Sequence, residues 1–281
     1  MGLVFFGTSQ FAAEVVHALA DGPWRPALVV SRPDARQGRG RTLAPPPAAE
    51  AAQTLGLPLL QPENVNDAAT AAAVAAATGD EGAVVLCAFG ALITAPLLDG
   101  PPIYNIHPSL LPRWRGAAPI ERAIQAGDDE TGVSIMRLVE ALDAGPVYAQ
   151  RAIPLSPEDD YGSTAARLLP LAVELLKDVL DQRPAATPQP PAGVTYAEKI
   201  TAADRTISLD DDPALVARTV RALRPHIGAR LLLPDGTFLG VDDARVSDNG
   251  TLELLTVRPP GGRSMPYEDY VRGHGPVTPA R

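Results

Sequence analysis

The sequence contains very little cysteine: Cys87 is the single cysteine among 281 residues. One thiol cannot form a disulfide within the chain, so we expect a reducing compartment, the cytoplasm. Cys87 lies in the apolar run AVVLCAFG, where a small buried strand residue is much more common than a nucleophile. We therefore expect its thiol to take no part in chemistry.

Long apolar stretches, dinucleotide fingerprints and clusters of metal ligands are also missing. No stretch reaches the ~18 apolar residues that a membrane helix needs, and the opening MGLVFFGTSQFAAEVVHALA lacks the basic region of a signal peptide. Neither G-x-G-x-x-G nor a Walker A loop follows the first apolar run. The four histidines are far apart. We therefore expect no metal site, no NAD site and no membrane partner.

Positive charge is scarce as well. The net charge is −9, which argues against a nucleic-acid partner. However, residues 205–281 hold ten arginines and ten acidic residues, so the acidic excess lies before them. Within that acidic part, RPDARQGRGR (Arg32–Arg41) carries four arginines against one aspartate. A solvated loop and a local nucleic-acid contact both remain open for this segment.

Short apolar runs alternate with helical patterns over the first 180 residues. Such β–α alternation, with nearly all-apolar strands, indicates a mainly parallel, Rossmann-like α/β sheet with helices on both faces. The expected strands are Leu3–Phe6, Ala27–Ser31, Ala83–Ala88, Ile103–His107 and a hairpin pair, Thr131–Leu138 and Val147–Ile153. The expected helices are Gln10–Ala20, Ala48–Leu55, Asp67–Thr78, Ala117–Ala126 and Ser163–Gln182, the last with Ser163 or Thr164 as its cap.

A chain of this length suggests two domains. The proline-rich PAATPQPP (Pro184–Pro191) cannot continue a helix and indicates a semi-rigid linker. Beyond it, an amphipathic helix (Pro213–Leu223) precedes short runs typical of the strands of a small barrel: Ala229–Leu233, Phe238–Val241 and Leu252–Val257. We therefore divide the chain into residues 1–183, a linker of residues 184–204, and residues 205–281.

The most informative stretch is NIHPSLLPRWRGAAPI (Asn105–Ile120). Because strand side chains alternate, Asn105 and His107 at the end of a strand point to the same face. Ligands of parallel sheets bind at the carboxyl ends of the strands. An amide donor beside a group that titrates near neutrality suits acyl transfer, which needs a hydrogen bond for the oxyanion and a proton carrier. A hydrogen-bonded strand-end pair with no catalytic role is the alternative.

This stretch resembles the signature of the folate-dependent formyltransferases, and its RWRGAAPI ending is similar to the branch that acts on methionyl-tRNA. TGVSIMRLVEALDAGPV resembles the second signature of the family. The resemblance implies a catalytic trio of Asn105, His107 and Asp143, although an Asp in such a turn sequence is usually only a turn residue. It also implies transfer of a formyl group from 10-formyltetrahydrofolate to the α-amino group of methionyl initiator tRNA, for translation initiation.

The same resemblance implies two folate-binding segments. SLLP matches the family segment that lines the folate, and CAFGAL matches the backbone loop that holds the pterin. The family more often has Tyr at the position of Phe89, and backbone contacts would survive that change. The implied folate-binding residues are Ser109, Leu110, Leu111, Pro112, Cys87, Phe89, Gly90 and Leu92.

The resemblance also implies a tRNA partner. SRPDARQGRGRTLAPPPAAEAA resembles the basic loop that is proposed to grip the acceptor arm, which implies contacts by Arg36, Arg39 and Arg41. TYAEKI and RPPGGRSMPYEDYVRG match the entry and the end of an OB-like C-terminal tRNA-binding domain, and family enzymes that act on small amines lack these elements. The neutral C-terminal segment and Ala48, where lysine is common, depart from the pattern.

We expect a monomeric enzyme on this resemblance. Two alternatives stay open: a formyltransferase that uses a small amine such as an amino-sugar nucleotide, and a tRNA- or folate-binding protein without catalysis.

Overall fold

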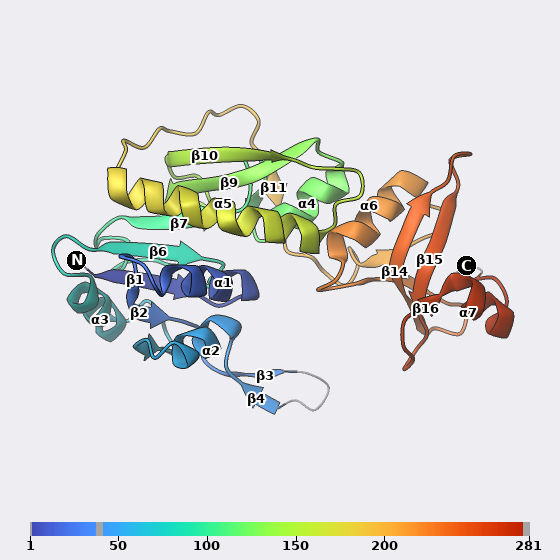
Figure 1. Cartoon of the computed structure of the whole chain (residues 1–281), viewed down its shortest axis with the longest axis horizontal. Helices are drawn as coiled ribbons and strands as arrows, with labels where there is room; N and C mark the ends of the chain where they lie inside the picture. The colour runs from blue at the N-terminus through green and yellow to red at the C-terminus, as the bar shows by residue number, and fades with distance from the viewer. Residues whose placement is uncertain (1, 38–41, 278–281) are drawn as a thin grey trace. The chain divides into compact units, whose positions relative to one another are not determined.

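The computed structural model describes residues 2–37 and 42–277 (Figure 1). It divides into two compact units, each built from three separate stretches of the chain. Unit 1 comprises Met1–Ala117, Gly132–Ala152 and Arg167–Tyr196, and unit 2 comprises Ala118–Thr131, Ile153–Ala166 and Ala197–Arg281.

A seven-stranded sheet forms the centre of unit 1, in the order β10-β9-β7-β6-β1-β2-β5. Its strands are β1 (Leu3–Gly7), β2 (Pro26–Val30), β5 (Leu59–Leu60), β6 (Ala83–Cys87), β7 (Ile103–His107), β9 (Glu130–Arg137) and β10 (Val147–Pro154). From β7 to β5 all pairs are parallel, and β9 pairs antiparallel with β7. The predicted mainly parallel α/β sheet is confirmed, and the two strands expected as a hairpin pair are neighbours.

Four helices accompany this sheet: α1 (Gln10–Leu19), α2 (Pro47–Thr54), α3 (Ala68–Thr78) and α5 (Tyr161–Gln182), whose first turn belongs to unit 2. The predicted cap of α5 is wrong. The helix begins two residues before Ser163, and Oδ1 of Asp160 accepts the Ser163 N–H over 2.8 Å. Because Asp160 already satisfies this end of the helix, neither Ser163 nor Thr164 is needed as a cap.

The sheet is buried because its strands are apolar on both sides. Val4 and Phe6 of β1 share one core cluster with Leu86 of β6 and Val74 of α3. Phe5, which points to the opposite face, is also fully buried. Both faces of the central strand are therefore covered, as expected for a parallel sheet.

Several short strands had no counterpart in the sequence-based prediction. β3 (Ala35–Gln37) and β4 (Thr42–Ala44) pair antiparallel within the arginine-rich segment. The two-residue strands β8 (Arg115–Gly116) and β11 (Tyr196–Ala197) form a second small pair. None of these has the apolar alternation that predicts a strand.

Unit 2 contains α4 (Pro119–Ala126), α6 (Pro213–Leu223), α7 (Tyr267–His274) and a five-stranded sheet. The strands, in spatial order, are β12 (Thr206–Ile207), β13 (Ala229–Leu232), β14 (Phe238–Val246), β15 (Leu252–Arg258) and β16 (Met265–Pro266). The apolar face of α6, with Val216 and Val220, packs on Leu231 and Val241 of this sheet. In the part of the chain that the structure describes, β12 and β16 do not pair with each other, so hydrogen bonds do not close the sheet into a barrel.

The loops that follow β1, β6 and β7 leave the sheet of unit 1 at one edge, because these strands are parallel. The Thr8 hydroxyl, after β1, donates to the carbonyl of Phe89, after β6, over 2.7 Å. Asn105 and His107, at the end of β7, lie at this carboxyl edge. Within the described ranges, no helix combines the length and the apolar character needed to cross a membrane.

Candidate active site

Asn105 and His107 lie at the carboxyl end of β7, on one face of the strand. They continue the row begun by Ile103, whose side chain is part of the core. Both are buried, with 5% and 4% of their surface exposed. Polar side chains buried to this degree need hydrogen-bond partners, and the surrounding loops supply them.

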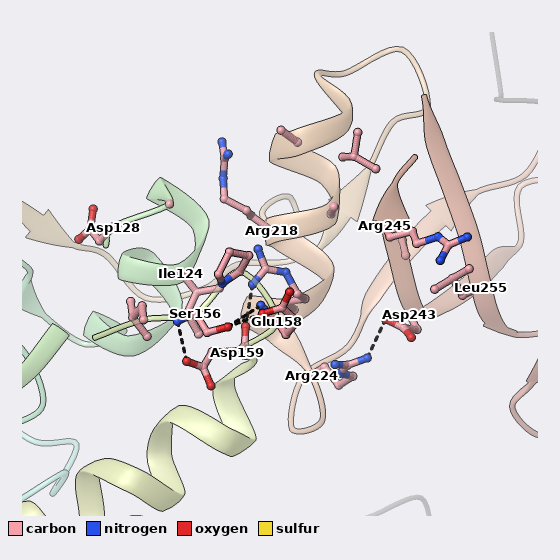
Figure 2. A pocket seen from close by; sticks show the side chains of 18 of the residues that line it. Ile124, Asp128, Ser156, Glu158, Asp159, Arg218, Arg224, Asp243, Arg245 and Leu255 are labelled. Atoms are coloured by element: carbon pink, nitrogen blue, oxygen red, sulfur yellow. Dashed lines mark hydrogen bonds and ion pairs between the residues drawn. The ribbon is translucent and has the colours of Figure 1, made fainter. Parts of the chain in front are cut away.

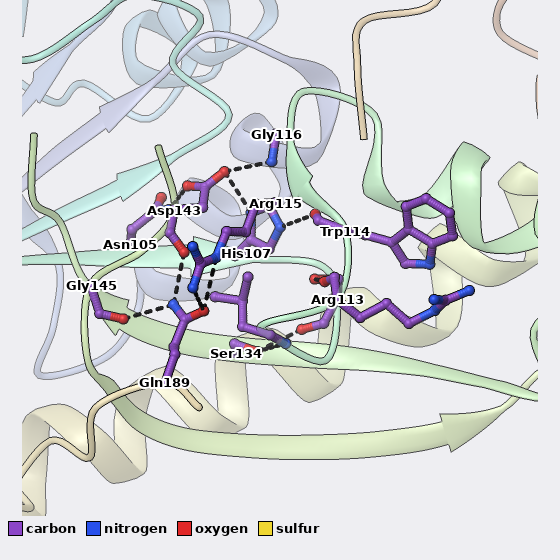
Figure 3. Close-up of polar contacts among 12 residues, drawn as sticks. Asn105, His107, Arg113, Trp114, Arg115, Gly116, Ser134, Asp143, Gly145 and Gln189 are labelled. Carbon is purple, nitrogen blue, oxygen red and sulfur yellow. Dashed lines mark hydrogen bonds and ion pairs between the residues drawn. The ribbon is translucent and has the colours of Figure 1, made fainter. Parts of the chain in front are cut away.

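The partner of His107 is a backbone carbonyl. Nε2 of His107 lies 2.8 Å from the carbonyl oxygen of Trp114 (Figure 3). A carbonyl can only accept, so Nε2 carries a hydrogen. Nδ1 is therefore the ring nitrogen that can gain or lose a proton. Trp114 has a φ of +63°, a sparsely populated conformation for a bulky residue, so the surrounding structure must hold this carbonyl in place.

Asp143 completes the arrangement from the turn between β9 and β10. Its Oδ2 accepts the backbone N–H of Gly116 over 2.8 Å and lies 3.7 Å from Nδ1 of His107. Its Oδ1 accepts from the side-chain amide of Asn105 over 3.4 Å. The structure thus brings together the three residues predicted as a trio, although Asp143 is 36 positions or more away from the other two in sequence.

The turn that carries Asp143 is tightly closed. Asp143 has a φ of +44°, in the left-handed region that Asp tolerates better than most residues. A Cβ at position 145 would lie 1.8 Å from the carbonyl oxygen of Arg137, so Gly145 is required there. This close approach fixes the direction in which the Asp143 side chain leaves the backbone.

The arrangement combines a hydrogen-bond donor, a proton carrier and a carboxylate. One hydrogen of the Asn105 amide is directed at Asp143, which leaves its second hydrogen available. Protonated Nδ1 of His107 could donate to a developing oxyanion, and the Asp143 carboxylate could stabilise the charged imidazole. These are the groups that acyl transfer requires.

The predicted SLLP segment forms a loop whose backbone is hydrogen-bonded to side chains of β9 and β10. The Ser134 hydroxyl donates to the carbonyl of Ser109 over 2.6 Å and accepts the Leu111 N–H over 3.2 Å. The Gln150 amide donates to the carbonyl of Leu111 over 2.7 Å. Ser109 and Leu111 are buried, whereas Leu110 and Pro112 are half-buried. Side chains of β9 and β10 therefore fix the shape of this loop.

Two side chains of the predicted CAFGAL segment, Cys87 and Phe89, are buried in the core. Cys87 is 1% exposed, and burial raises the pKa of its thiol to about 12. The Phe89 ring packs edge-on against Phe6, with centroids 5.4 Å apart. Gly90 has a φ of +76°, and Leu92 is 67% exposed. The rings of Phe6 and Phe89 are thus inside the core, whereas the Leu92 side chain is exposed.

An open cavity of about 560 Å³ lies within unit 1, beside the Asp143 turn. Residues 94–99 after β6 and residues 137–146 before β10 line it, including Leu98, Arg137 and Val139. Its volume lies in the range of small-molecule sites. Among the described residues, no group of three or more His, Cys, Asp or Glu side chains could hold a metal ion.

A larger cavity, of about 800 Å³, lies within unit 2 between α4, α6 and β14 (Figure 2). Four arginines line it, and each donates to oxygens of the chain itself: Arg218 to the carbonyl of Gln125, Arg221 to the carbonyl of Asp159, Arg224 to Asp160 and Asp243, and Arg245 to Glu253. Burial is the main cause that lowers the pKa of Arg221. The four arginines thus bind oxygens of unit 2 itself. Asn105, His107 and Asp143 do not line this cavity.

Comparison with known proteins decides the class of the chain. Residues 1–180 match the family described as formyl transferase. The chain belongs to the formyl transferase family. A methionyl-tRNA formyltransferase of Thermus thermophilus is 40% identical over 298 residues, which cover 98% of this chain and 97% of the relative.

Two solved structures share the fold. A methionyl-tRNA formyltransferase from Clostridium thermocellum superimposes with a TM-score of 0.65 at 12% identity, over 95% of this chain and 99% of its own. WlaRD, a sugar 3N-formyl transferase solved in the presence of dTDP and 5-N-formyl-THF, gives a TM-score of 0.65 at 12% identity, over 88% and 87% of the two chains. At this identity the likeness concerns the fold alone.

The arginine loop of this formyl transferase is described in part. Arg36 lies in β3, opposite Leu43 of β4, and is exposed. Arg39 and Arg41, the other two predicted tRNA contacts, lie outside the described residues.

Three residues that contact the trio were missed in the sequence. Trp114 and Gly116 lie in the highlighted RWRG run but act through backbone atoms, for which no sequence pattern exists. Gln189 comes from the proline-rich segment, and its amide donates to the carbonyls of Asp143 and Gly145 over 2.7 and 2.8 Å. A lone amide side chain among prolines was the only available signal.

Proposed function

We propose that this formyl transferase carries the formyl group of 10-formyltetrahydrofolate to the α-amino group of methionyl initiator tRNA, giving N-formylmethionyl-tRNA. The observation that supports it best is the convergence of Asn105, His107 and Asp143 at the carboxyl edge of the sheet. The chain is also 40% identical, along nearly its whole length, to a methionyl-tRNA formyltransferase.

In the proposed chemistry, bound 10-formyltetrahydrofolate supplies the formyl group that the methionyl amine attacks. The second hydrogen of the Asn105 amide and the protonated Nδ1 of His107 stabilise the negative charge that develops on the formyl oxygen. The hydrogen bond between Nε2 of His107 and the Trp114 carbonyl holds the imidazole ring in the orientation that this role requires.

Asp143 has two roles in this proposal. Its carboxylate, 3.7 Å from Nδ1, compensates the charge of the protonated imidazole. It also accepts, through a water molecule, the proton that the attacking amine loses, and returns a proton to the departing nitrogen. The Gly116 N–H keeps Oδ2 in place during both steps.

We assign the folate co-substrate to the SLLP loop, the CAFGAL loop and the 560 Å³ cavity. The chain's own chemistry suits such a ligand, because a flat pterin needs backbone hydrogen bonds and apolar contacts. Exposed Leu92 and half-buried Leu110 offer apolar surface, and Gly90, with a φ of +76°, lets the backbone turn without a side chain. The folate-binding set we propose is Cys87, Phe89, Gly90, Leu92, Ser109, Leu110, Leu111 and Pro112.

For the tRNA we propose contacts by Arg36, Arg39 and Arg41. We further propose that residues 1–183 form the catalytic part, 184–204 the linker and 205–281 an OB-like tRNA-binding part. The short antiparallel strands β13, β14 and β15, with α6 packed on them, support this last assignment. A monomer in the cytoplasm, where charged tRNA is used, fits this function.

The test supplies purified protein and 10-formyltetrahydrofolate with one acceptor at a time: methionyl initiator tRNA, methionyl elongator tRNA or an amino-sugar nucleotide. Mass spectrometry of each acceptor should show one added formyl group on the methionine of initiator tRNA, and none without folate. Formylation of the sugar nucleotide without formylation of tRNA would contradict the proposal. No product with any acceptor would favour a binding protein instead.

A further inference from the structure

The segment that follows α5, which the sequence indicates as a linker, reaches back into the active site of unit 1. Its first contact with the loops of the trio is the side-chain amide of Gln189 (Figure 3). Nε2 of Gln189 donates to the carbonyls of Asp143 and Gly145, over 2.7 and 2.8 Å. Oε1 accepts twice from the guanidinium of Arg115, over 2.7 and 3.1 Å. One side chain thus joins the Asp143 turn to the loop that follows β7.

The orientation of the Gln189 amide follows from this pattern. Both its donor hydrogens meet carbonyl oxygens, and its oxygen meets a cationic donor. A turned amide would place oxygen against the two carbonyls of Asp143 and Gly145 and nitrogen against Arg115. All four contacts would then become repulsive, so Gln189 has a single favourable placement.

The second contact of the segment is Thr195. Its hydroxyl accepts the backbone N–H of Trp114 over 2.9 Å, and its carbonyl accepts the N–H of Arg115 over 2.9 Å. Trp114 is the left-handed residue whose carbonyl binds Nε2 of His107. A bulky residue at a φ of +63° is strained and persists only where its surroundings enforce it. Thr195 therefore accepts hydrogen bonds from the N–H of the strained Trp114 and from the N–H of the next residue, Arg115.

We propose that Gln189 and Thr195 are positioning residues of the formyl transfer, and that together they form a clasp on the two loops of the trio. Gln189 fixes the turn that carries Asp143, and Thr195 fixes the carbonyl that orients His107. Neither side chain has a hydrogen bond to the trio's own side-chain atoms. The clasp sets the distance between Nδ1 of His107 and the Asp143 carboxylate. This inference rests on the proposed function for its kinetic test.

A simple tether would behave differently. If the segment only connected the two ends of the chain, loss of these contacts would lower stability and leave the rate of the chemical step unchanged. A positioning role predicts a fall in kcat, because a displacement of about 1 Å can cost about 10²-fold in rate. Substrate binding should change little, since neither residue belongs to the proposed folate or tRNA contacts.

Two substitutions at Gln189 separate its contacts with the carbonyls of Asp143 and Gly145 from its contact with Arg115. Gln189→Ala removes all four hydrogen bonds. Gln189→Glu keeps the shape and the bond to Arg115 but places a carboxylate oxygen against the carbonyls of Asp143 and Gly145. We expect both variants to lose at least ~10-fold in kcat, with KM for folate and tRNA within ~3-fold of wild type. Wild-type kcat in Gln189→Glu would overturn the role assigned to the Asp143 contact.

A matched pair at Thr195 provides an independent test. Thr195→Val keeps the shape and loses the acceptor for the Trp114 N–H, so kcat should fall. Thr195→Ser keeps the hydroxyl and should restore kcat to near the wild-type value. Thr187→Ala is the control, since Thr187 lies in the same segment, is exposed, and pairs with Val147 through backbone atoms only. If the Gln189 variants fail to fold, the Thr195 pair decides: wild-type kcat in Thr195→Val overturns the clasp.

The hydrogen-exchange rate of the Trp114 amide tests the clasp without a measurement of enzyme activity. The Trp114 amide should exchange at least ~10-fold faster in Thr195→Val than in wild type or in Thr195→Ser, because its hydrogen-bond acceptor is lost. Equal exchange rates would overturn the clasp even if the enzyme formylated nothing. Conversely, an inactive wild-type protein with the predicted exchange would contradict the proposed function and leave the clasp intact. The two failures are therefore distinguishable.

Discussion

Nε2 of His107 donates its hydrogen to the carbonyl oxygen of Trp114 over 2.8 Å. This single bond selects the tautomer of the neutral ring and directs Nδ1 toward Asp143, 3.7 Å away. Histidines that carry protons in enzymes are commonly oriented by a partner on the second nitrogen. Here the backbone carbonyl of Trp114, a residue with a φ of +63°, binds one ring nitrogen, and the Asp143 carboxylate faces the other.

His107→Ala and Asn105→Ala should each lower kcat for formyl transfer by at least ~10², because each removes a group that stabilises the developing oxyanion. Steady-state kinetics at saturating substrates would measure this, with thermal unfolding to verify the fold. His17→Ala, which alters an exposed histidine on α1, is the matched control and should behave as wild type. Near wild-type turnover in the His107 and Asn105 variants would remove the proposed chemistry.

Replacing Arg36, Arg39 and Arg41 together by Ala should raise KM for methionyl-tRNA. The dependence of binding on salt should also weaken, by about 0.7 to 0.9 in the log–log slope for each lost phosphate contact. KM for folate serves as the internal control and should hardly change. Unchanged tRNA kinetics at every salt concentration would mean that the segment is a solvated loop.

The thiol of Cys87 should be inert in the folded protein. It is 1% exposed, and burial raises its pKa to about 12, so the reactive thiolate is rare at pH 8. A thiol reagent such as dithionitrobenzoate should react with less than one tenth of the protein in minutes at pH 8, and with all of it in denaturant. Rapid complete labelling of the native protein would show that the thiol is accessible and would contradict this prediction. Cys87→Ala should keep kcat within ~3-fold, because the folate contact proposed for Cys87 is made by its backbone and its side chain only fills the core.

Asp204 should give unit 2 a pH-dependent stability. The Thr201 hydroxyl is the main cause that lowers its pKa from 3.8 to about 2, and Arg122 adds to the effect from 2.9 Å. A carboxyl whose pKa is lower in the folded state stabilises the fold above its unfolded pKa. That contribution is lost as pH falls from about 4 to about 2 and amounts to about 2 kcal/mol.

Asp204→Asn should therefore lower the urea midpoint at pH 6, and the difference from wild type should shrink toward pH 2. Asp235→Asn is a useful comparison because Asp235 is also held by a threonine, in a surface turn without an ion pair. A difference that stays constant between pH 6 and pH 2 would show that the ionised carboxylate of Asp204 is not the stabilising form.

The central sheet could be predicted because its signal is local. The apolar run of β1 and the alternation of β7 carry their own strand pattern, and period 2 places Asn105 beside His107 without further information. The bounds of α6 follow in the same way from Asp212 and Pro213 at its start and its apolar face. In α5 the same kind of rule selected the wrong cap, because Asp160 lies just upstream of Ser163.

The contacts that orient the trio could not be predicted, because they are long-range and use backbone atoms. Every residue has a backbone carbonyl, and every residue except proline has a backbone N–H, so the contacts of Trp114 and Gly116 leave no mark in the sequence. Gln189 reaches Asp143 across 46 positions, and Thr195 reaches Trp114 across 81. The proline content indicates a stiff segment after α5, but stiffness does not predict which loops of unit 1 the segment contacts.

In the proposed reaction, the trio of Asn105, His107 and Asp143 transfers a formyl group to methionyl initiator tRNA. Its most direct test is the single-turnover rate of N-formylmethionyl-tRNA formation at saturating 10-formyltetrahydrofolate, for wild type and for Asp143→Asn. Asn keeps an acceptor for the Gly116 N–H but removes the negative charge 3.7 Å from Nδ1 of His107. We expect product with wild type only when folate is present, and a rate at least ~10²-fold lower in Asp143→Asn. No product with wild type, or an unchanged rate in Asp143→Asn, would contradict it.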